Sequence, residues 1–484
     1  MPAGEAEVRA EGLSLLNVMP PSRPSPKEGR SFSFPRSPSR RAVGKPMAAD
    51  GSRFGGARLG ETGKGEESKK RKDIMNINKN FNKTVLLFSS LIFIITSCKK
   101  TDDKPYYDYF VSKELAVTYT TTAITSMLSS GVQSYPAISE IIQYIKSDVN
   151  VCKMVYKTDV FGEEIEASGL VCVPVNPGEY PVVSFQNGTN TVNAYAPSEY
   201  VINPSYQLVE YIASMGFIVV IPDYPGFGRS KQIPHPYLIA EPTVRSVVDM
   251  LYALEESCEY EFDGIEARNE YYLVGYSQGG WATLALHKAL ELDYNDDFEL
   301  HGSVCGAGPY NLYDLLREMT DTTAYPMPYY LGYIINAYSY YDQFTNPVSD
   351  VLNEPYASRL NTLYTGTLTG DQINNQLSTS IPQLFKPDFI SGFTSSAAYS
   401  SVREALEKNS ISPWATYKPL LLVHGEGDTH VSVTATLNMY DEMLIAGTSS
   451  ETCSKVIFPY LDHGDAILPA MIEGLKFIIN LSDQ

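Results

Sequence analysis

The chain has 484 residues, 43% of them hydrophobic, which is enough for a large buried core in one or more domains. Its net charge is −19 and unevenly distributed: residues 1–97 carry 17 basic and 9 acidic groups, whereas the remainder carries 20 and 47. A body that acidic repels polyanions, so the composition argues against nucleic-acid binding.

Residues 1–74 are rich in Pro, Ser, Gly and Arg and show no sustained apolar periodicity. Such a segment is typical of disorder, or of an upstream extension that begins at the wrong start codon. What starts at Met75 suggests the second interpretation: two lysines precede an apolar run over 84–96 that is too short to span a bilayer. We therefore expect residues 75–97 to be a signal peptide for export.

The signal ends in Ile95-Thr96-Ser97-Cys98, which resembles the lipobox of bacterial lipoproteins. The resemblance implies that Cys98 is acylated and becomes the first residue of the mature chain, anchored by its lipid without spanning the membrane. Residues 98–110 are then expected to be a tether, and the expected location is the cell envelope, on the periplasmic or outer face of a bacterial outer membrane. An ordinary cleaved secretory signal is the alternative, and it also places the protein outside the cytoplasm.

Five cysteines follow Cys98, and an odd number leaves at least one thiol free. Cys152 and Cys172 lie symmetrically about Phe161-Gly162-Glu163 on two strand-like runs, so they could face each other across a hairpin and form a disulfide. No spacing of potential ligands indicates a metal site, and no cofactor is expected.

From Val151 onward, short apolar runs alternate with helical patterns. An opening hairpin followed by strand–helix alternation predicts an α/β fold over 111–484, with a mostly parallel sheet covered by helices on both faces. In such sheets the chemical groups gather at the carboxyl ends of the strands. The predicted strands are 152–156, 169–173, 181–185, 217–222, 271–275, 302–305, 420–424 and 455–458, and the predicted helices are 137–145, 206–215, 244–256, 281–290, 433–444 and 466–481.

The most informative segment is Gly275-Tyr276-Ser277-Gln278-Gly279, which joins a predicted strand to a predicted helix. Strand, sharp turn and helix together form a nucleophile elbow, which exposes a serine hydroxyl above the edge of the sheet. The alternative is a turn of glycines around a serine that caps the helix. The partners described next favour the elbow.

A serine hydroxyl becomes a good nucleophile only with a base within hydrogen-bond reach and a third group that orients the base. Of six histidines, His463 follows the last predicted strand and precedes the last predicted helix. This position fits the chain order serine, acid, histidine that is known from enzymes with a nucleophile elbow. The acid is expected after the preceding strand, where Asp428 is the prediction and Glu426 its competitor.

The developing oxyanion needs two backbone donors. One is expected to be the N–H of Gln278, directly after the nucleophile. The other is expected from the loop after strand 181–185, where Thr189 supplies the N–H and Gly188 lets the backbone approach closely. A simple Asn-Gly turn is the alternative interpretation of that loop.

The interval from Ser277 to Asp428 is much longer than the roughly 60 residues that two further strand–helix steps require. The surplus, about 309–412, is interpreted as an inserted, largely helical cap over the strand ends. Seven tyrosines lie between 325 and 341. They could line an acyl or aromatic pocket, stack on sugars, or pack within the cap.

Together these residues resemble the α/β-hydrolase superfamily and, within it, the secretory lipase group of capped esterases and lipases. With Asp428, His463 and the long insertion, the resemblance covers about 140–482. The family pattern His-Gly-x-x-Asp aligns on Asp428 and favours it over Glu426. The family usually has His before the glycine of the oxyanion loop, whereas this chain has Asn187. The segments that carry the resemblance are 156–159 leading to 167–170, 185–189, 222–228 and 275–280.

The resemblance implies a serine hydrolase that cleaves a small-molecule or lipid carboxylic ester through an acyl-enzyme. A serine peptidase of the same fold is one alternative, and an aminopeptidase of that type would need an acidic anchor for the substrate amine. The other alternative is a surface lipoprotein that binds glycans or lipids without catalysis. The intact serine, acid and histidine positions argue against that last alternative.

Overall fold

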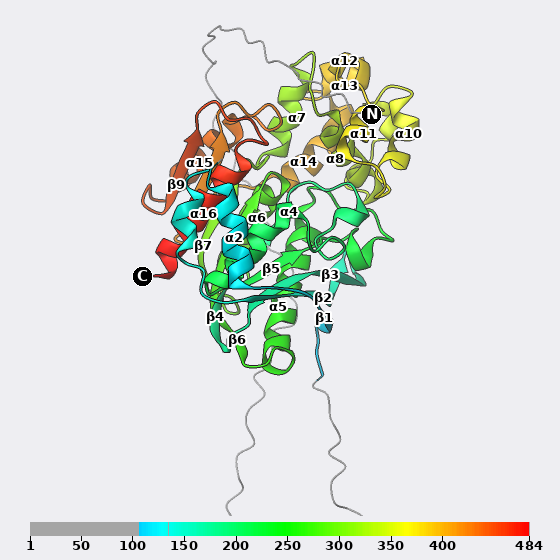
Figure 1. The fold of residues 1–484 in the computed structure, drawn as a ribbon. Helices are drawn as coiled ribbons and strands as arrows, with labels where there is room; N and C mark the ends of the chain where they lie inside the picture. The colour runs from blue at the N-terminus through cyan, green and yellow to red at the C-terminus, as the bar shows by residue number, and fades with distance from the viewer. Residues whose placement is uncertain (1–105, 134, 484) are drawn as a thin grey trace, which may run out of the picture.

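A nine-stranded sheet forms the centre of the molecule in the computed structural model, which describes residues 106–133 and 135–483 (Figure 1). The predictions for residues 1–105, including the signal peptide and Cys98, lie outside the described residues. The strand order is β1-β2-β3-β5-β4-β6-β7-β8-β9. The strands are β1 (Phe110–Tyr119), β2 (Val149–Val160), β3 (Glu163–Pro174), β4 (Gly178–Gln186), β5 (Ile218–Pro222), β6 (Ile265–Tyr276), β7 (Leu300–Gly306), β8 (Leu420–Gly425) and β9 (Cys453–Phe458).

The sheet has an antiparallel beginning and a parallel body. β1, β2, β3 and β5 pair antiparallel in succession, whereas the neighbours from β5 to β9 pair in parallel. Apart from the edge strand β9, which is partly buried, the parallel strands are buried on both faces at their carboxyl ends. Successive residues of one strand enter different hydrophobic clusters, as Leu420 and Leu421 do. Burial on both faces explains why these segments read as unbroken apolar runs. The predicted fold, a mostly parallel sheet with helices on both faces, is confirmed.

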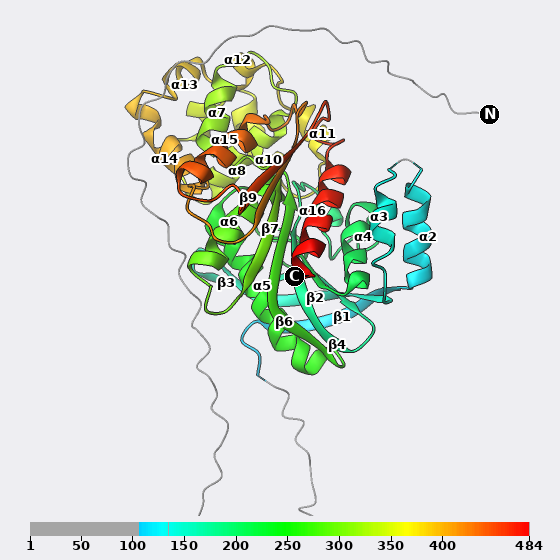
Figure 2. The same cartoon turned by 90° about the vertical axis from the view of Figure 1, so that its left-hand side faces the viewer.

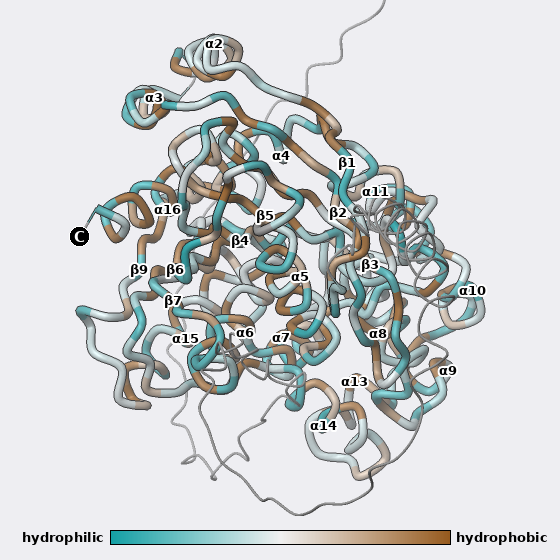
Figure 3. Tube along the Cα trace, turned by 90° about the horizontal axis from the view of Figure 1, so that it is seen from below, coloured by the Kyte–Doolittle hydropathy of each residue, from teal (hydrophilic) through white to brown (hydrophobic). Residues whose placement is uncertain are grey.

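Helices cover both faces of the sheet (Figure 3). On one face lie α5 (Ala240–Glu261), α6 (Gln278–Leu292) and α15 (Thr434–Ile445). On the other face lie α2 (Thr121–Gly131), α3 (Ile138–Ile142), α4 (Pro204–Glu210) and α16 (Ile467–Ser482). Three short 3₁₀ helices in the connections are η1 (Asn193–Tyr195), η2 (Tyr211–Met215) and η3 (Gly228–Ser230).

A long helical segment, residues 309–412, joins the neighbouring strands β7 and β8, and we call it the cap. Figures 1 and 2 show its helices gathered at one end of the sheet. The helices are α7 (Leu312–Thr320), α8 (Pro328–Tyr340), α9 (Val348–Val351), α10 (Tyr356–Leu363), α11 (Gly370–Asn374), α12 (Ile381–Leu384), α13 (Pro387–Gly392), η4 (Ala397–Tyr399) and α14 (Ser400–Asn409).

The hairpin between β2 and β3 corrects the predicted disulfide. Its loop is Phe161-Gly162, and both residues have positive φ angles, 55° and 89°, as a two-residue type I′ turn requires. The register therefore pairs Cys152 with Val171 and places Cys172 opposite the preceding residue of β2. The prediction assumed a register one residue different, and a shift of one residue moves every side chain to the other face. Cys152 and Cys172 point to opposite faces of the sheet, and both are free thiols.

Candidate active site

Ser277 lies in a strained turn between β6 and α6. Its φ and ψ are 61° and −122°, a conformation that non-glycine residues rarely adopt. The N–H of Ser277 donates to the carbonyl oxygen of Gly306 on β7 at 2.8 Å, which fixes the turn against the sheet. A Cβ on Gly279 would collide with the carbonyl oxygen of Gln186, so the chain can turn this closely only with glycine there. The sequence of the elbow thus permits the strained turn that places Ser277 at the wall of a cavity.

Asp428 and His463 are joined by a short hydrogen bond. The Nδ1 of His463 lies 2.6 Å from the Oδ2 of Asp428. The other carboxyl oxygen, Oδ1, accepts the backbone N–H groups of His430 at 2.8 Å and Val431 at 2.9 Å. A proton on Nδ1 that is held by the carboxylate leaves Nε2 of His463 as the nitrogen able to accept a proton.

Asp428 stays ionised although it is buried. Burial opposes its negative charge, but hydrogen bonds from the imidazoles of His424, at 3.1 Å, and His463 outweigh that effect and hold the pKa of Asp428 well below its ordinary value. The competitor Glu426 is exposed, and its Oε2 accepts the N–H of Tyr460 at 3.4 Å. The structure therefore brings Asp428 to His463 and leaves Glu426 at the surface.

Tyr276 connects the elbow to the loop of His463. Its hydroxyl donates to the carbonyl oxygen of His463 at 2.8 Å, and its ring lies 5.1 Å from the imidazole. The N–H of His463 donates to Asp462 Oδ1 at 2.7 Å, which also accepts the N–H of Thr429 in the Asp428 loop at 3.0 Å. The two loops are thus tied to each other and to the residue before the nucleophile.

The loop after β4 packs against the turn that holds Ser277. A Cβ on Gly188 would be 3.4 Å from the carbonyl oxygen of Tyr276 and 3.9 Å from the Cβ of Ser277. The next residue, Thr189, hydrogen-bonds through Oγ1 to the hydroxyl of Tyr237 at 2.8 Å. Gln278 follows Ser277 as the first residue of α6. Gly188, Thr189 and Gln278 are therefore brought together around the serine.

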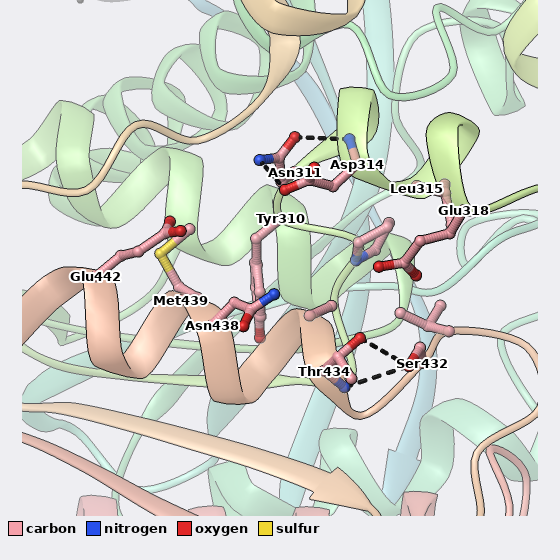
Figure 4. A pocket seen from close by; sticks show the side chains of 13 residues that line it. Tyr310, Asn311, Asp314, Leu315, Glu318, Ser432, Thr434, Asn438, Met439 and Glu442 are labelled. Atoms are coloured by element: carbon pink, nitrogen blue, oxygen red, sulfur yellow. Dashed lines mark hydrogen bonds between the residues drawn. The ribbon is translucent and has the colours of Figure 1, made fainter. Parts of the chain in front are cut away.

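Ser277 and His463 line one cavity of about 440 Å³, together with Gly188 and Thr189. Tyr330 of α8 contributes to its lining from the cap. A separate cavity between α7 and α15 (Figure 4) measures about 30 Å³ and includes neither Ser277 nor His463. That volume holds about one water molecule.

Sequence comparison decides the family. The model of the secretory lipase family matches residues 200–467, more than half of the chain. The chain belongs to the secretory lipase family. The matched segment contains Ser277, Asp428, His463 and the whole cap, and this secretory lipase is accordingly a hydrolase of carboxylic esters. A secretory family also implies a location outside the cytoplasm.

Solved structures share the fold of this secretory lipase. A Legionella pneumophila protein named only as a hydrolase has 25% sequence identity and a TM-score of 0.69, over 78% of this chain and 99% of that one. The rice cell wall degrading esterase LipA of Xanthomonas oryzae has 24% identity and a TM-score of 0.66, over 78% and 98%. Candida antarctica lipase A has 14% identity and a TM-score of 0.55, over 77% and 81%. No curated protein is similar enough in sequence to count as a relative.

Two residues that the sequence did not single out, His235 and Tyr237, contact Gln278 and Thr189 beside Ser277. The side-chain Nε2 of Gln278 lies 2.7 Å from Nε2 of His235, and Nδ1 of His235 lies 2.8 Å from the carbonyl oxygen of Pro225. A carbonyl can only accept, so Nδ1 carries the proton and Nε2 accepts from the Gln278 amide. Burial lowers the pKa of His235 to about 4, which keeps the ring neutral. No local pattern marks either residue.

Asn187, which departs from the family pattern, has a buried structural contact. Its Nδ2 donates to the carbonyl oxygen of Pro222 at 3.0 Å, and its own carbonyl accepts the hydroxyl of Tyr224 at 3.3 Å. The asparagine therefore ties the loop after β4 to the end of β5, directly before Gly188.

The cap tyrosines divide between cavity lining and packing. Tyr330 lines the cavity, whereas the hydroxyls of Tyr325, Tyr338 and Tyr341 donate to the backbone carbonyls of other segments. Within residues 106–133 and 135–483, no group of three or more His, Cys, Asp or Glu side chains could hold a metal ion. In the same part of the chain, no helix is long and apolar enough to cross a membrane.

Proposed function

We propose that this secretory lipase cleaves its ester through an acyl-enzyme on Ser277, with His463 as the proton-transfer group and Asp428 as its ionised partner. The observation that carries the proposal is the 2.6 Å hydrogen bond between Asp428 and His463 in a cavity that Ser277 also lines. Such a pair lets a serine hydroxyl lose its proton while it attacks, which the hydroxyl cannot do alone at neutral pH.

In the first half of the reaction, Ser277 Oγ bonds to the ester carbonyl carbon, and its proton passes to Nε2 of His463. The carbonyl oxygen becomes an oxyanion, which the N–H groups of Gln278 and Thr189 stabilise, with Gly188 leaving room for the approach. The carbon–oxygen bond to the alcohol then breaks, and His463 returns the proton to the leaving oxygen. The acyl group remains on Ser277.

In the second half, a water molecule gives one proton to His463 and its oxygen bonds to the acyl carbon. The bond to Ser277 breaks as His463 returns the proton to Oγ, and a carboxylic acid leaves. Throughout both halves, Asp428 stabilises the imidazolium form of His463. The lowered pKa of Asp428 supports this role, because the carboxylate is charged at neutral pH.

The test is the Ser277→Ala variant. We expect hydrolysis of p-nitrophenyl butyrate to fall by at least about 10⁴-fold while the melting temperature stays within a few degrees of the parent. Ser391→Ala, at an exposed position on α13, is the matched control and should keep full activity. A fluorophosphonate probe should label the parent and the control but not Ser277→Ala. Undiminished turnover in Ser277→Ala would remove the proposal.

The cavity lining favours an ester over a peptide with a free amino terminus. Among the described residues, the lining contains no Asp, Glu, Lys or Arg. The described lining includes one histidine, His463, and several tyrosines. An aminopeptidase would need a carboxylate there to hold the substrate ammonium group. Aminoacyl p-nitroanilides should therefore be hydrolysed far more slowly than aliphatic p-nitrophenyl esters.

The proposal extends to the N-terminus, where 75–97 would be the export signal and Cys98 the lipidated residue of an envelope lipoprotein. Its support is the lipobox resemblance, together with the family's secretory character. Metabolic labelling with palmitate should mark the parent and not Cys98→Ser, and the variant should leave the membrane fraction. Equal labelling of both chains would contradict the anchor and leave the triad proposal untouched.

A further inference from the structure

The cavity of Ser277 has an apolar wall formed by two helices on the same face of the sheet. α4 contributes Leu208 and Val209, and α16 contributes Ile467, Leu468 and Met471. Figure 2 shows α16 and α4 next to each other, with α3 and α2 beyond them. Leu208 and Ile467 are 38% and 44% exposed, so the wall presents apolar surface to whatever enters the cavity.

The chemistry of this cavity fits an uncharged aliphatic chain. Its volume of about 440 Å³ is more than ten times the roughly 30 Å³ that one water molecule occupies in the liquid, far more than an acetyl group fills. Burial against the apolar wall would contribute roughly a fourfold gain in binding for each methylene group. With no carboxylate, lysine or arginine among the described lining residues, a charged chain would gain no partner there.

Three side chains lie between the cavity of Ser277 and a second cavity. Leu208, Leu468 and Met471 line the cavity of Ser277 and also line a narrow second cavity of about 30 Å³. The rest of that second cavity is apolar and comes from α2, α3, η2 and the next turns of α16. The three side chains therefore form a partition between a wide space at the serine and a narrow apolar space behind it.

We propose that the space between α4 and α16 binds the acyl chain of a neutral aliphatic ester, and that the partition of Leu208, Leu468 and Met471 sets the longest chain accepted. The substrate class is esters of medium-chain fatty acids. This inference rests on the proposed function, in which the acyl group is bonded to Ser277. The acyl group stays on Ser277 until the second half of the reaction, whereas the alcohol leaves after the first, so a pocket of limited depth beside the serine selects the acyl part.

The experiment changes the partition and measures kcat/KM on p-nitrophenyl acetate, butyrate, octanoate, laurate and palmitate. In Met471→Trp, the larger side chain shortens the space, and we expect the laurate-to-butyrate ratio to fall at least about tenfold. In Met471→Ala, the two cavities join, and the palmitate-to-laurate ratio should rise several-fold. Met319→Ala, a partly buried methionine on α7 outside the cavity, is the matched control and should leave both ratios within about twofold of the parent.

A second series holds the acyl group as butyrate and lengthens the alcohol. The partition variants should leave the profile of this series as it is in the parent. A shift in the alcohol series instead of the acyl series would overturn the inference, and so would unchanged acyl ratios in both Met471 variants. If Met471→Trp does not fold by circular dichroism, Leu468→Phe shortens the same space and is judged by the same ratios.

The two proposals fail differently. A parent protein that neither reacts with a fluorophosphonate nor hydrolyses any ester of the series would contradict the proposed function and this inference together. A parent that reacts at Ser277 and hydrolyses esters would contradict this inference alone if its acyl-chain ratios were the same in the Met471 variants.

Discussion

The two sides of Ser277 are held in place in different ways. On the charged side, Asp428 and His463 follow the neighbouring strands β8 and β9 and bind each other and their own loops. On the other side, which we propose to bind the oxyanion and call the oxyanion side, Gln278 and Thr189 are held by His235 and Tyr237, from the connection between β5 and α5. The charged side is a local arrangement at the sheet edge, whereas the oxyanion side depends on a distant segment.

That distant segment is itself fixed by the cap. The hydroxyl of Tyr341 donates to the carbonyl of Pro234 at 2.5 Å, and the hydroxyl of Tyr338 donates to that of Leu238 at 2.9 Å. Between these points, the ring of Tyr237 stacks on Tyr333 of α8 at 4.3 Å. A displacement of the cap would therefore reach Gln278 and Thr189 before it reached the hydrogen bond between Asp428 and His463.

The largest expected effect breaks the charged side. Asp428→Asn keeps the size of the side chain but removes the charge, so His463 loses its orienting acceptor and the stabilisation of its imidazolium form. We expect kcat to fall by about 10⁴-fold with the fold retained. Glu426→Gln, the same chemical change two residues earlier, should leave the rate unchanged. Equal losses of kcat in the two variants would show that Asp428 is not the acid of the site.

The next effect breaks the oxyanion side. His235→Ala frees the side chain of Gln278, which starts α6, and we expect kcat to fall by roughly 10- to 100-fold with little change in KM, because the loss concerns the transition state. His235→Gln can still accept from the Gln278 amide and should recover part of the loss. His301→Ala, a partly exposed histidine on β7, is the control. A change in KM alone would indicate that His235 shapes the substrate site instead.

A smaller effect tests the link to the cap. Tyr237→Phe removes the hydroxyl that binds Thr189 but keeps the ring that stacks on Tyr333. The loss of one hydrogen bond predicts a fall in kcat of about 2- to 10-fold. Tyr333→Ala removes the stack and should lower kcat by at least as much, although it lies in the cap. Independent, additive effects in the double variant would contradict a shared path through Tyr237.

The last effect concerns stability and sharpens the comparison by leaving both sides of the site intact. Burial raises the pKa of Glu210, on α4, to about 8 from an ordinary value of 4.5, although the nearby Tyr119 opposes the shift. Between these pH values the folded state holds a proton that the unfolded state has lost, so the free energy of unfolding falls as pH rises, by up to about 1.4 kcal/mol per pH unit.

Glu210→Gln removes this titration. Thermal unfolding at pH 5 and pH 7.5 should show a smaller decrease in melting temperature for the variant than for the parent, and the difference between the two proteins cancels the other titrating groups. Tyr119 of β1, Tyr211 of η2 and Cys172 of β3 face the same carboxyl group and remain unchanged in both. Identical pH slopes would show that Glu210 is not the group responsible.

The sequence predicts the parallel body of the sheet well, and at its antiparallel beginning it predicts the hairpin of β2 and β3 but neither its register nor β1. Apart from the edge strand β9, the parallel strands are buried on both faces at their carboxyl ends and form apolar runs that stand out. β1 is an edge strand whose inner residues are mostly exposed, so FVSKELAVTY shows no such run and was not predicted. α2 buries only Ile124 and Leu128, too few for a helical pattern to be recognised. The hairpin register depended on a two-residue turn that symmetry about the glycine does not reveal.

The same contrast holds in the site. Asp428 and His463 could be placed from the sequence because each follows a predicted strand, and strand ends meet at one edge. His235 and Tyr237, which lie in a proline-rich loop, could not be placed. Their side chains contact residues that are 43 and 48 positions away in the chain. Tertiary hydrogen bonds of this type leave no periodicity in the chain.

The buried thiols decide in which redox conditions this domain can fold and stay folded. Cys152, Cys172, Cys258, Cys305 and Cys453 are all unpaired and enclosed, and burial raises the pKa of each, so few thiolates exist to react with oxidants. The domain can thus keep its sulfur in the reduced state in an oxidising compartment without the help of a disulfide isomerase. It can equally be manufactured inside a reducing cytosol, because no cross-link has to form for these residues to reach their native packing.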